Sequence, residues 1–571
     1  MAFVKSYWSL ILVLILSLGT ILPLFHPGFF PIHDNTQIER VYEMNKSLSD
    51  GFFPVRWVED LGYGYGYPIF NFYSPLPYYL GSMFIFLGLN ALVATKAIFA
   101  LGIILSGVFM YIFIKQIFGE LPGLISAIIY LYFPYHAINI YVRGDLDEIF
   151  AYAFLPLVFL GIFKTFLIFK EKPQTNSGLK WLIILAVSVA LVIISHNLTS
   201  FMLLIILMPL VLVLFGVSNF NLKLISYYFI ALFVGFLLSS FYSIPALLEM
   251  NYTNVTSQIG GGASFSDHFV CLDQFWNSAW GYGGSTKSCL DGMSFKIGKL
   301  NIAIAFLSLL ILFTIRLKNK MKLEKKDYIY LLSIVFFFIS LIMSTSYSSF
   351  VWNLVPNMSF IQYPWRFLNF AGLFISIAAG FMVLKTETLI GKKIHLLIVS
   401  LIVILTIGYN LKLFNPQSYY LSPSDYYTNQ NHIKWETSKI SDEYMPRDFF
   451  KPKNQTEIVQ KRFEFDQEVK INSILDNTQN IALDFEALKP TRLYINIAHF
   501  PGWKITSDEK EEAMITNKGY ILNVSPGHRL VNIRFEGTKV QKTANMLTII
   551  GILIVVIGII NIRQKRISRG S

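Results

Sequence analysis

Apolar stretches long enough to cross a bilayer as helices recur from one end of this chain to the other. A helix needs roughly 20 mainly apolar residues to span the hydrocarbon core. The composition agrees, because 54% of the residues are hydrophobic and only 14% are charged. These features predict a polytopic α-helical membrane protein.

The positive-inside rule orients the predicted spans. Twelve spans are expected: 7–25, 95–117, 121–139, 148–169, 180–195, 198–216, 222–247, 299–315, 328–347, 367–384, 394–412 and 545–562. Basic clusters that include Lys170 and Lys172, Lys320 and Lys322, and Arg563 mark the cytoplasmic loops, and the first span is expected to be a retained signal anchor. The net charge of +12 therefore reflects loops rather than nucleic-acid binding.

If every apolar stretch crossed the membrane, the side of the N-terminus would disagree with the basic loops by one crossing. One stretch is therefore expected not to cross. Residues 75–90 are short and open with Ser-Pro-Leu-Pro, so they fit a helix at the outer interface. Residues 26–94 then lie wholly outside the cell, and both termini lie on the cytoplasmic side of the cell membrane. The polar motifs HDNTQIER, YVRGDLDE, SHN and QYPWR all fall on this outer face, and such convergence of costly charges indicates a site.

The His33-Asp34 pair has two interpretations of equal weight. Asp34 either caps the amphipathic helix that follows it, or has a catalytic role as a general base or as a ligand of a divalent ion. Glu39 and Arg40 would most simply belong to a solvated helix face. The tyrosines of 62–68 would sit in the headgroup belt or, less simply, stack on a sugar ring.

The other outer motifs offer cations beside acids. Arg143 is suited to hold a phosphate, and Glu148 lies where a helix dipole favours negative charge. His196 belongs to a polar turn between two spans. Arg366 either binds a lipid phosphate or extends to the headgroups.

Residues 413–544 change character and are expected to form an outer β-rich domain. Apolar and polar residues alternate in 492–500, 520–527 and 530–537, which predicts strands of a small sandwich. Residues 1–412 would form the transmembrane domain, and 545–571 the last span with a basic tail. Cys271 and Cys289 share one outer loop and are either a disulfide or two free thiols.

The motifs together resemble a known family. The segments His33-Asp34, GFFPVRW (51–57), LGYGYGYPIFNFYSPLPYYL (61–80), RGDLDEIFAYAFLPL (143–157), SHN (195–197), PWRF (364–367) and SDEYMP (441–446) are similar to integral-membrane proteins labelled 6-pyruvoyl-tetrahydropterin synthase-related, which are placed in the GT-C superfamily of glycosyltransferases. The pterin label finds no support, because the chain has no His-rich zinc constellation.

The resemblance implies an enzyme that moves a sugar from a polyprenyl-phosphate donor to an extracytoplasmic glycan, lipid or protein. Asp34 matches the essential acidic residue of the first outer loop, with His33 beside it. The expected substrate-binding residues are Arg143, Asp145, Glu148, His196, Arg366, Glu39 and Arg40. A divalent cation, Mg²⁺ or Mn²⁺, would be the cofactor if any is used, with Asp34 as its ligand.

Two other functions compete with glycosyl transfer. A lipid or glycan transporter would use the same cations, but transporters usually show internal repeats and helices broken at the bilayer midplane, and the sequence shows no such symmetry. If the chain were a non-catalytic envelope-assembly protein, the cluster of charged residues on the outer face would remain unexplained.

Overall fold

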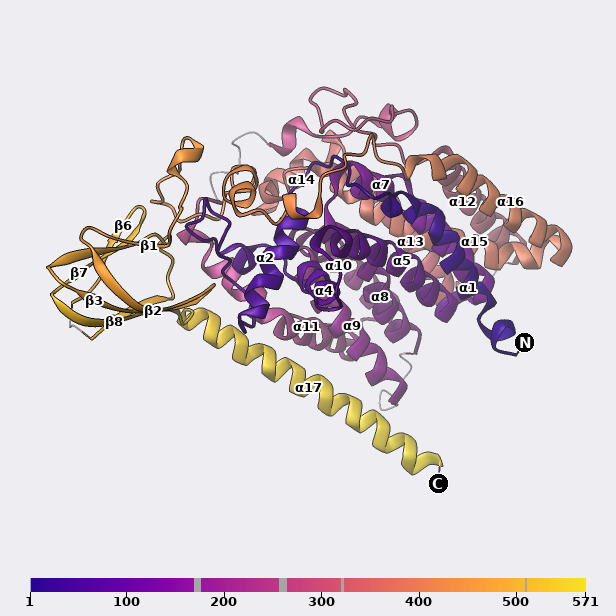
Figure 1. Cartoon of the computed structure of the whole chain (residues 1–571). Helices are drawn as coiled ribbons and strands as arrows, with labels where there is room; N and C mark the ends of the chain where they lie inside the picture. Colours follow the sequence, from indigo (N-terminus) through magenta and orange to yellow (C-terminus); the bar gives the residue numbers. More distant parts are fainter. Residues whose placement is uncertain (1, 169–175, 256–263, 320–322, 509–510, 571) are drawn as a thin grey trace.

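The computed structural model describes residues 2–168, 176–255, 264–319, 323–508 and 511–570. A helical bundle makes up most of the molecule, and eight strands gather at one end of it (Figure 1). The helices are α1 (Ala2–Ile21), α2 (Gln37–Ser49), α3 (Ile69–Phe72), α4 (Leu76–Phe86), α5 (Ala91–Phe118), α6 (Glu120–Leu131), α7 (Pro134–Ile138), α8 (Leu146–Ile168), α9 (Asn176–Ser195), α10 (Asn197–Val217), α11 (Leu222–Leu248), α12 (Lys299–Asn319), α13 (Lys325–Met343), α14 (Ser349–Leu354), α15 (Leu368–Ile390), α16 (Lys392–Asn410) and α17 (Lys539–Gly570).

The helices confirm the multi-pass membrane class. Within the described residues, 10 helices are long and apolar enough to cross a membrane, or 11 if α6 and the segment Pro134–Arg143, bent by 45°, count as one span. The remaining predicted span, 299–315, lies in α12, whose apolar part is shorter. Lys170, Lys172, Lys320 and Lys322, which helped to orient the predicted spans, lie outside the described residues.

The stretch 75–90 forms α4, a helix of only 11 residues. Its length of about 16 Å, at 1.5 Å per residue, is roughly half the bilayer core. It packs on α2 and α5, while Met83, Phe86 and Leu87 stay exposed. Helix α4 is therefore too short to span the membrane, which agrees with the orientation expected from the positive-inside rule.

Helix α15 forms the centre of the bundle and packs against α6, α12 and α13. Small residues let these helices approach closely. A Cβ atom at Gly372 would lie 2.8 Å from the ring of Phe133, and one at Gly380 would lie 2.4 Å from Ser126 Oγ. The start of α15, which directly follows the Pro-Trp-Arg motif, is thereby fixed against α6 and the residues just after it.

The first polar segment is packed into the protein rather than spread over its surface. The tyrosines of 62–68 are buried, so neither a headgroup belt nor an exposed sugar platform describes them. Tyr63 and Tyr65 pack against Phe449, and the Tyr67 hydroxyl accepts a hydrogen bond from the main chain of Tyr444 at 3.1 Å. This segment therefore binds residues 414–462, which approach it from far along the chain.

The strands confirm a C-terminal β-rich region with two antiparallel sheets. One sheet has the order β1-β4-β7-β6 and the other β2-β3-β8-β5. The strands are β1 (Phe463–Phe465), β2 (Val469–Asn477), β3 (Asn480–Ala487), β4 (Thr491–Ile495), β5 (Trp503–Ser507), β6 (Met514–Thr516), β7 (Gly519–Val524) and β8 (Gly527–Phe535). The predicted strands 492–500, 520–527 and 530–537 correspond to β4, β7 and β8, whereas residues 414–462 form loops and short helical turns.

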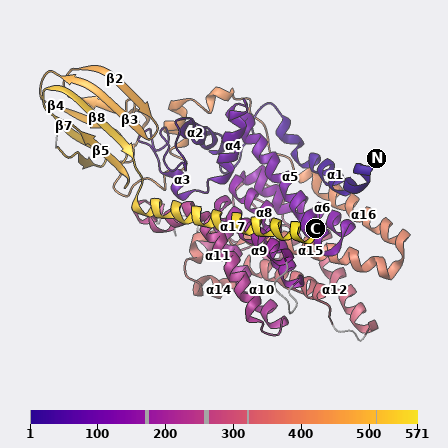
Figure 2. The same ribbon diagram turned by 90° about the horizontal axis from the view of Figure 1, so that it is seen from below.

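The β-sheet region is anchored to the first polar segment by Trp57. The Trp57 ring is fully buried and lies 5.4 Å from the ring of Trp503 and 6.0 Å from that of Phe535. Its carbonyl accepts a hydrogen bond from the Gln479 side chain at 3.0 Å. Helix α17 then leaves the sheets and runs back along α11 and α9 (Figures 1 and 2).

We expect Trp57→Ala to loosen the β-sheet region from the bundle. Removing a buried Trp side chain costs about 3–5 kcal/mol, and here the cavity would open at the junction itself. Limited proteolysis should cut the variant near residues 455–462 faster than the wild type. Trp276→Ala is the matched control, because Trp276 is 51% exposed. Equal cleavage of both variants would contradict the anchoring role.

Candidate functional site

Asp34 is fixed to the RGD segment by its main chain. The Asp34 N–H donates to the carbonyl of Arg143 at 2.9 Å, and the His33 N–H donates to the preceding carbonyl at 3.1 Å. Gly144 makes this approach feasible, since its φ is +64° and a Cβ atom there would lie 2.3 Å from the Ile32 side chain. Two motifs far apart in sequence therefore meet at one point.

Asp34 is not the cap of the helix that follows it. The N-cap residue of α2 is Thr36, and no side chain caps this end of the helix. Asp34 as a whole residue is partly exposed. Of the two interpretations from sequence, simple capping is wrong.

Charged groups of both signs surround the Asp34 carboxyl. Burial and the negative charge of Asp145 raise the pKa of Asp34 to about 6, against the opposing effect of Arg143, Arg40 and Arg366. An acid with such a pKa is ionised at neutral pH yet accepts a proton readily. The carboxyl is therefore suited to act as a general base.

Two arginines and two carboxylates form a buried ion cluster beside Asp34. Arg143 contacts Asp145 at 2.5 Å and Glu148 at 2.7 Å through its two terminal nitrogens. Arg366, from the turn before α15, lies 3.6 Å from Glu148 and 4.0 Å from Asp145. All four predicted residues are thus brought together, and we call Arg143, Asp145, Glu148 and Arg366 the ion cluster.

Three neutral side chains hold Glu148 in place. Its Oε1 atom accepts hydrogen bonds from Tyr135 at 2.9 Å, Asn139 at 3.0 Å and Asn369 at 2.6 Å. The sequence analysis did not single out these residues. Asn139 and Asn369 could have been found from sequence, because both are polar amides within predicted apolar spans, where polar side chains often mark a site.

Arg366 does not extend to the membrane surface. Its side chain is buried, and its guanidinium lies 5.5 Å from the centre of the Tyr363 ring. Nε faces Glu148 at 3.6 Å without a hydrogen bond, and Nη1 has no partner among the described residues. A buried donor left unpaired costs about 1–3 kcal/mol. The Nη1 group therefore offers two N–H donors to a buried anion such as phosphate.

His196 lies close to the ion cluster, and its side chain caps α10. One ligand atom each of Asp145, Glu148 and His196 lie within 4.8 Å of one another, as in a metal site. However, all four carboxylate oxygens already accept hydrogen bonds, and His196 Nδ1 accepts from the Thr199 N–H at 3.3 Å. The two arginines that contact these carboxylates would also repel a further cation. This set does not fit a divalent cation.

Glu39 and Arg40 are buried, so the prediction of a solvated face is wrong. Glu39 pairs with His432 at 2.9 Å, and Arg40 donates to Ser441 at 3.0 Å. Residues 414–462 therefore cover the polar face of α2. Arg40 also acts electrostatically on Asp34, whereas Glu39 faces the covering segment.

We expect Glu148→Gln to destabilise the protein by about 3–5 kcal/mol, because the change leaves buried arginines without their counter-charge. Thermal unfolding in detergent would measure this effect. Glu486→Gln removes a carboxylate from an exposed pair with Lys470 and should change stability by less than about 1 kcal/mol. A Glu148→Gln protein as stable as this control would show that the ion cluster is not structural.

Comparison with known proteins gives a family and two distant structural likenesses. No curated protein matches the chain in sequence. The chain is similar to the solved structure of arabinofuranosyltransferase AftD from Mycobacteria, with 13% identity and a TM-score of 0.43, over 74% of this chain and 29% of that one. It is also similar to ArnT from Cupriavidus metallidurans bound to undecaprenyl phosphate, with 12% identity and a TM-score of 0.33, over 65% of this chain and 78% of that one.

The family is established by sequence. The chain spans less than a third of AftD, so these structures say little about the whole protein. The family described as "6-pyruvoyl-tetrahydropterin synthase related domain; membrane protein" matches residues 70–415, more than half of the chain. The chain therefore belongs to the 6-pyruvoyl-tetrahydropterin synthase-related membrane proteins.

Proposed function

We propose that this protein is a membrane glycosyltransferase. It moves a sugar from a polyprenyl-phosphate donor to an extracytoplasmic acceptor, which is an envelope glycan, a lipid or a protein. The observation that carries the proposal is the Arg366 guanidinium, whose Nη1 has no hydrogen-bond partner among the described residues. It contacts the same two carboxylates as Arg143 and lies near the partly exposed Asp34.

The donor phosphate would bind Arg366 and Arg143. Nη1 of Arg366, which has no hydrogen-bond partner among the described residues, carries two N–H groups that can donate to phosphate oxygens. Glu148, which holds both arginines, is fixed by three donors, so the cations need little rearrangement when the anion arrives. A lipid tail would lie in the bilayer while the phosphate sits at its edge.

Asp34 would supply the base. The acceptor hydroxyl attacks C1 of the sugar, the bond from C1 to the phosphate oxygen breaks, and Asp34 takes the hydroxyl proton. The lipid phosphate leaves with the electron pair of that bond, and the arginines stabilise its charge. Attack opposite the leaving group would invert the configuration at C1.

Two features support an extracytoplasmic site in the plasma membrane. The positive-charge pattern puts the four polar motifs on the outer side. In addition, Cys271 and Cys289 form a disulfide in the loop between α11 and α12, and disulfides persist mainly in oxidising compartments.

Asp34→Asn should reduce transfer by about 10²–10⁴-fold, the usual contribution of a general base. In the wild type, kcat/KM should fall about tenfold per pH unit below pH 6, because Asp34 is protonated there and cannot accept a proton. Comparing envelope glycans and lipids from cells with each variant would identify the product. Asp425→Asn, at an exposed carboxylate, is the control. Full activity of Asp34→Asn would refute this function.

Arg366→Ala should raise KM for the lipid-linked donor by about 10–100-fold, since a hydrogen bond to a charged group contributes about 1.5–3 kcal/mol. Arg366→Lys keeps the charge but not the planar guanidinium, so its KM should lie between those of the wild type and Arg366→Ala. Steady-state kinetics in nanodiscs would measure both, with exposed Arg447→Ala as the control. Tight donor binding without any turnover in the wild type would instead favour a transporter.

A further inference from the structure

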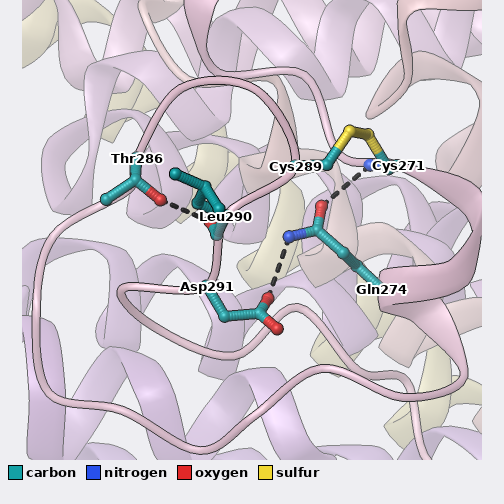
Figure 3. The surroundings of a disulfide bond; sticks show 6 residues. All are labelled: Cys271, Gln274, Thr286, Cys289, Leu290 and Asp291. Atoms are coloured by element: carbon teal, nitrogen blue, oxygen red, sulfur yellow. Dashed lines mark hydrogen bonds between the residues drawn. A yellow bond between two sulfur atoms is a disulfide. The ribbon is translucent and has the colours of Figure 1, made fainter.

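A long loop between α11 and α12 is closed by a disulfide and is not explained by the proposed chemistry. Residues Ser264–Gly298 of this loop are described, and Cys271 and Cys289 form the disulfide within it (Figure 3). The Gln274 side chain accepts a hydrogen bond from the Cys271 N–H at 2.9 Å and donates to Asp291 at 2.8 Å. The disulfide is thus connected to the opposite side of the loop.

Asp291 fixes the part of the loop that precedes Tyr282. It accepts hydrogen bonds from the Ser278 hydroxyl at 2.5 Å and from the Ala279 N–H at 3.0 Å. The chain at Tyr282 also forms a bridge with Met293. The disulfide, Asp291 and this bridge together leave the main chain at Tyr282 little freedom.

Tyr282 makes the contact between this loop and the site. Its carbonyl oxygen lies 3.1 Å from Nε2 of His33, the residue before Asp34. Its hydroxyl donates to the carbonyl of Asn415, at the start of the segment that covers α2. Tyr282 therefore joins the disulfide loop to the His33-Asp34 segment and to residues 414–462.

The loop also supports the phosphate side of the site. The His268 ring packs 4.8 Å from the ring of Tyr363, and the Arg366 guanidinium lies 5.5 Å above that same ring. One disulfide-closed loop thus contacts both the residue beside the base and the residue beneath the phosphate-binding arginine.

The contact with Tyr282 changes the role expected of His33. Loss of water around the ring lowers the pKa of His33, against the opposing effect of the hydrogen bond to Tyr282, and the nearby Arg143 lowers it further. A neutral imidazole whose Nε2–H donates to a carbonyl cannot take a proton at that nitrogen. His33 is therefore better suited to hold Asp34 in place than to react.

We propose that the disulfide-closed loop is a positioning element of the transfer site, which holds His33, and through it Asp34, by the carbonyl of Tyr282. This inference rests on the proposed glycosyl transfer. Reduction of Cys271–Cys289 would release the loop, so that His33 and Asp34 lose their fixed place and the transfer slows.

The test is to treat the full-length protein in nanodiscs with dithiothreitol, which reduces the disulfide to two thiols and is itself oxidised to a cyclic disulfide. We expect kcat/KM to fall about tenfold or more, because a displacement of about 1 Å costs roughly a hundredfold in rate. Reoxidation should restore it. The Cys271→Ser/Cys289→Ser variant should have the same low activity and no response to dithiothreitol.

Hydrogen exchange gives a readout that is independent of activity. The main-chain amides of His33 and Asp34 are bonded to the RGD segment, and reduction should make them exchange faster. His33→Ala should lower kcat and speed this exchange, whereas His33→Gln, which keeps a donor, should restore part of both.

The outcomes separate the two proposals. An active wild type whose rate and exchange are unchanged by reduction would overturn the positioning role. A wild type that transfers no sugar would overturn the proposed function, and the exchange of His33 and Asp34 would then still decide whether the loop holds them.

Discussion

The buried ion cluster is the interaction on which the rest of the site depends. Arg143 and Arg366 come from different parts of the chain, and Asp145 and Glu148 hold them together near the N-terminal ends of α8 and α15. Burying these charges is costly unless further hydrogen bonds satisfy them. The structure meets this need with neutral side chains on three elements, which makes the cluster a rigid junction between the helices.

Rigidity of this kind suits the chemistry proposed for the site. Dipoles and charges that are fixed before the reaction need not rearrange as charge develops on a leaving phosphate. Nη1 of Arg366 has no hydrogen-bond partner in the part of the chain that the structure describes, although every carboxylate oxygen in the ion cluster accepts a hydrogen bond. The acids therefore hold the two arginines in place, and Asp34 remains partly exposed.

Sequence patterns failed where a distant segment covered a polar surface. Helix α2 is amphipathic, and its polar face would normally meet water. Here residues 414–462 cover that face, so Glu39 meets His432 and Arg40 meets Ser441. The tyrosines of 62–68 were misplaced for the same reason. Periodicity identifies a polar face, but it cannot identify what packs against it.

The sequence by itself determined the membrane class, most of the spans, three of the eight strands in the described β-sheet region and the side-chain types of the site. These follow from local rules, because the length of an apolar run and the alternation of side chains depend only on neighbouring residues. Only the tertiary structure decided that Asp34 lies against Arg143, that Arg366 is buried, and that the disulfide loop reaches His33. Those contacts join segments far apart in sequence, and packing of the whole bundle sets them.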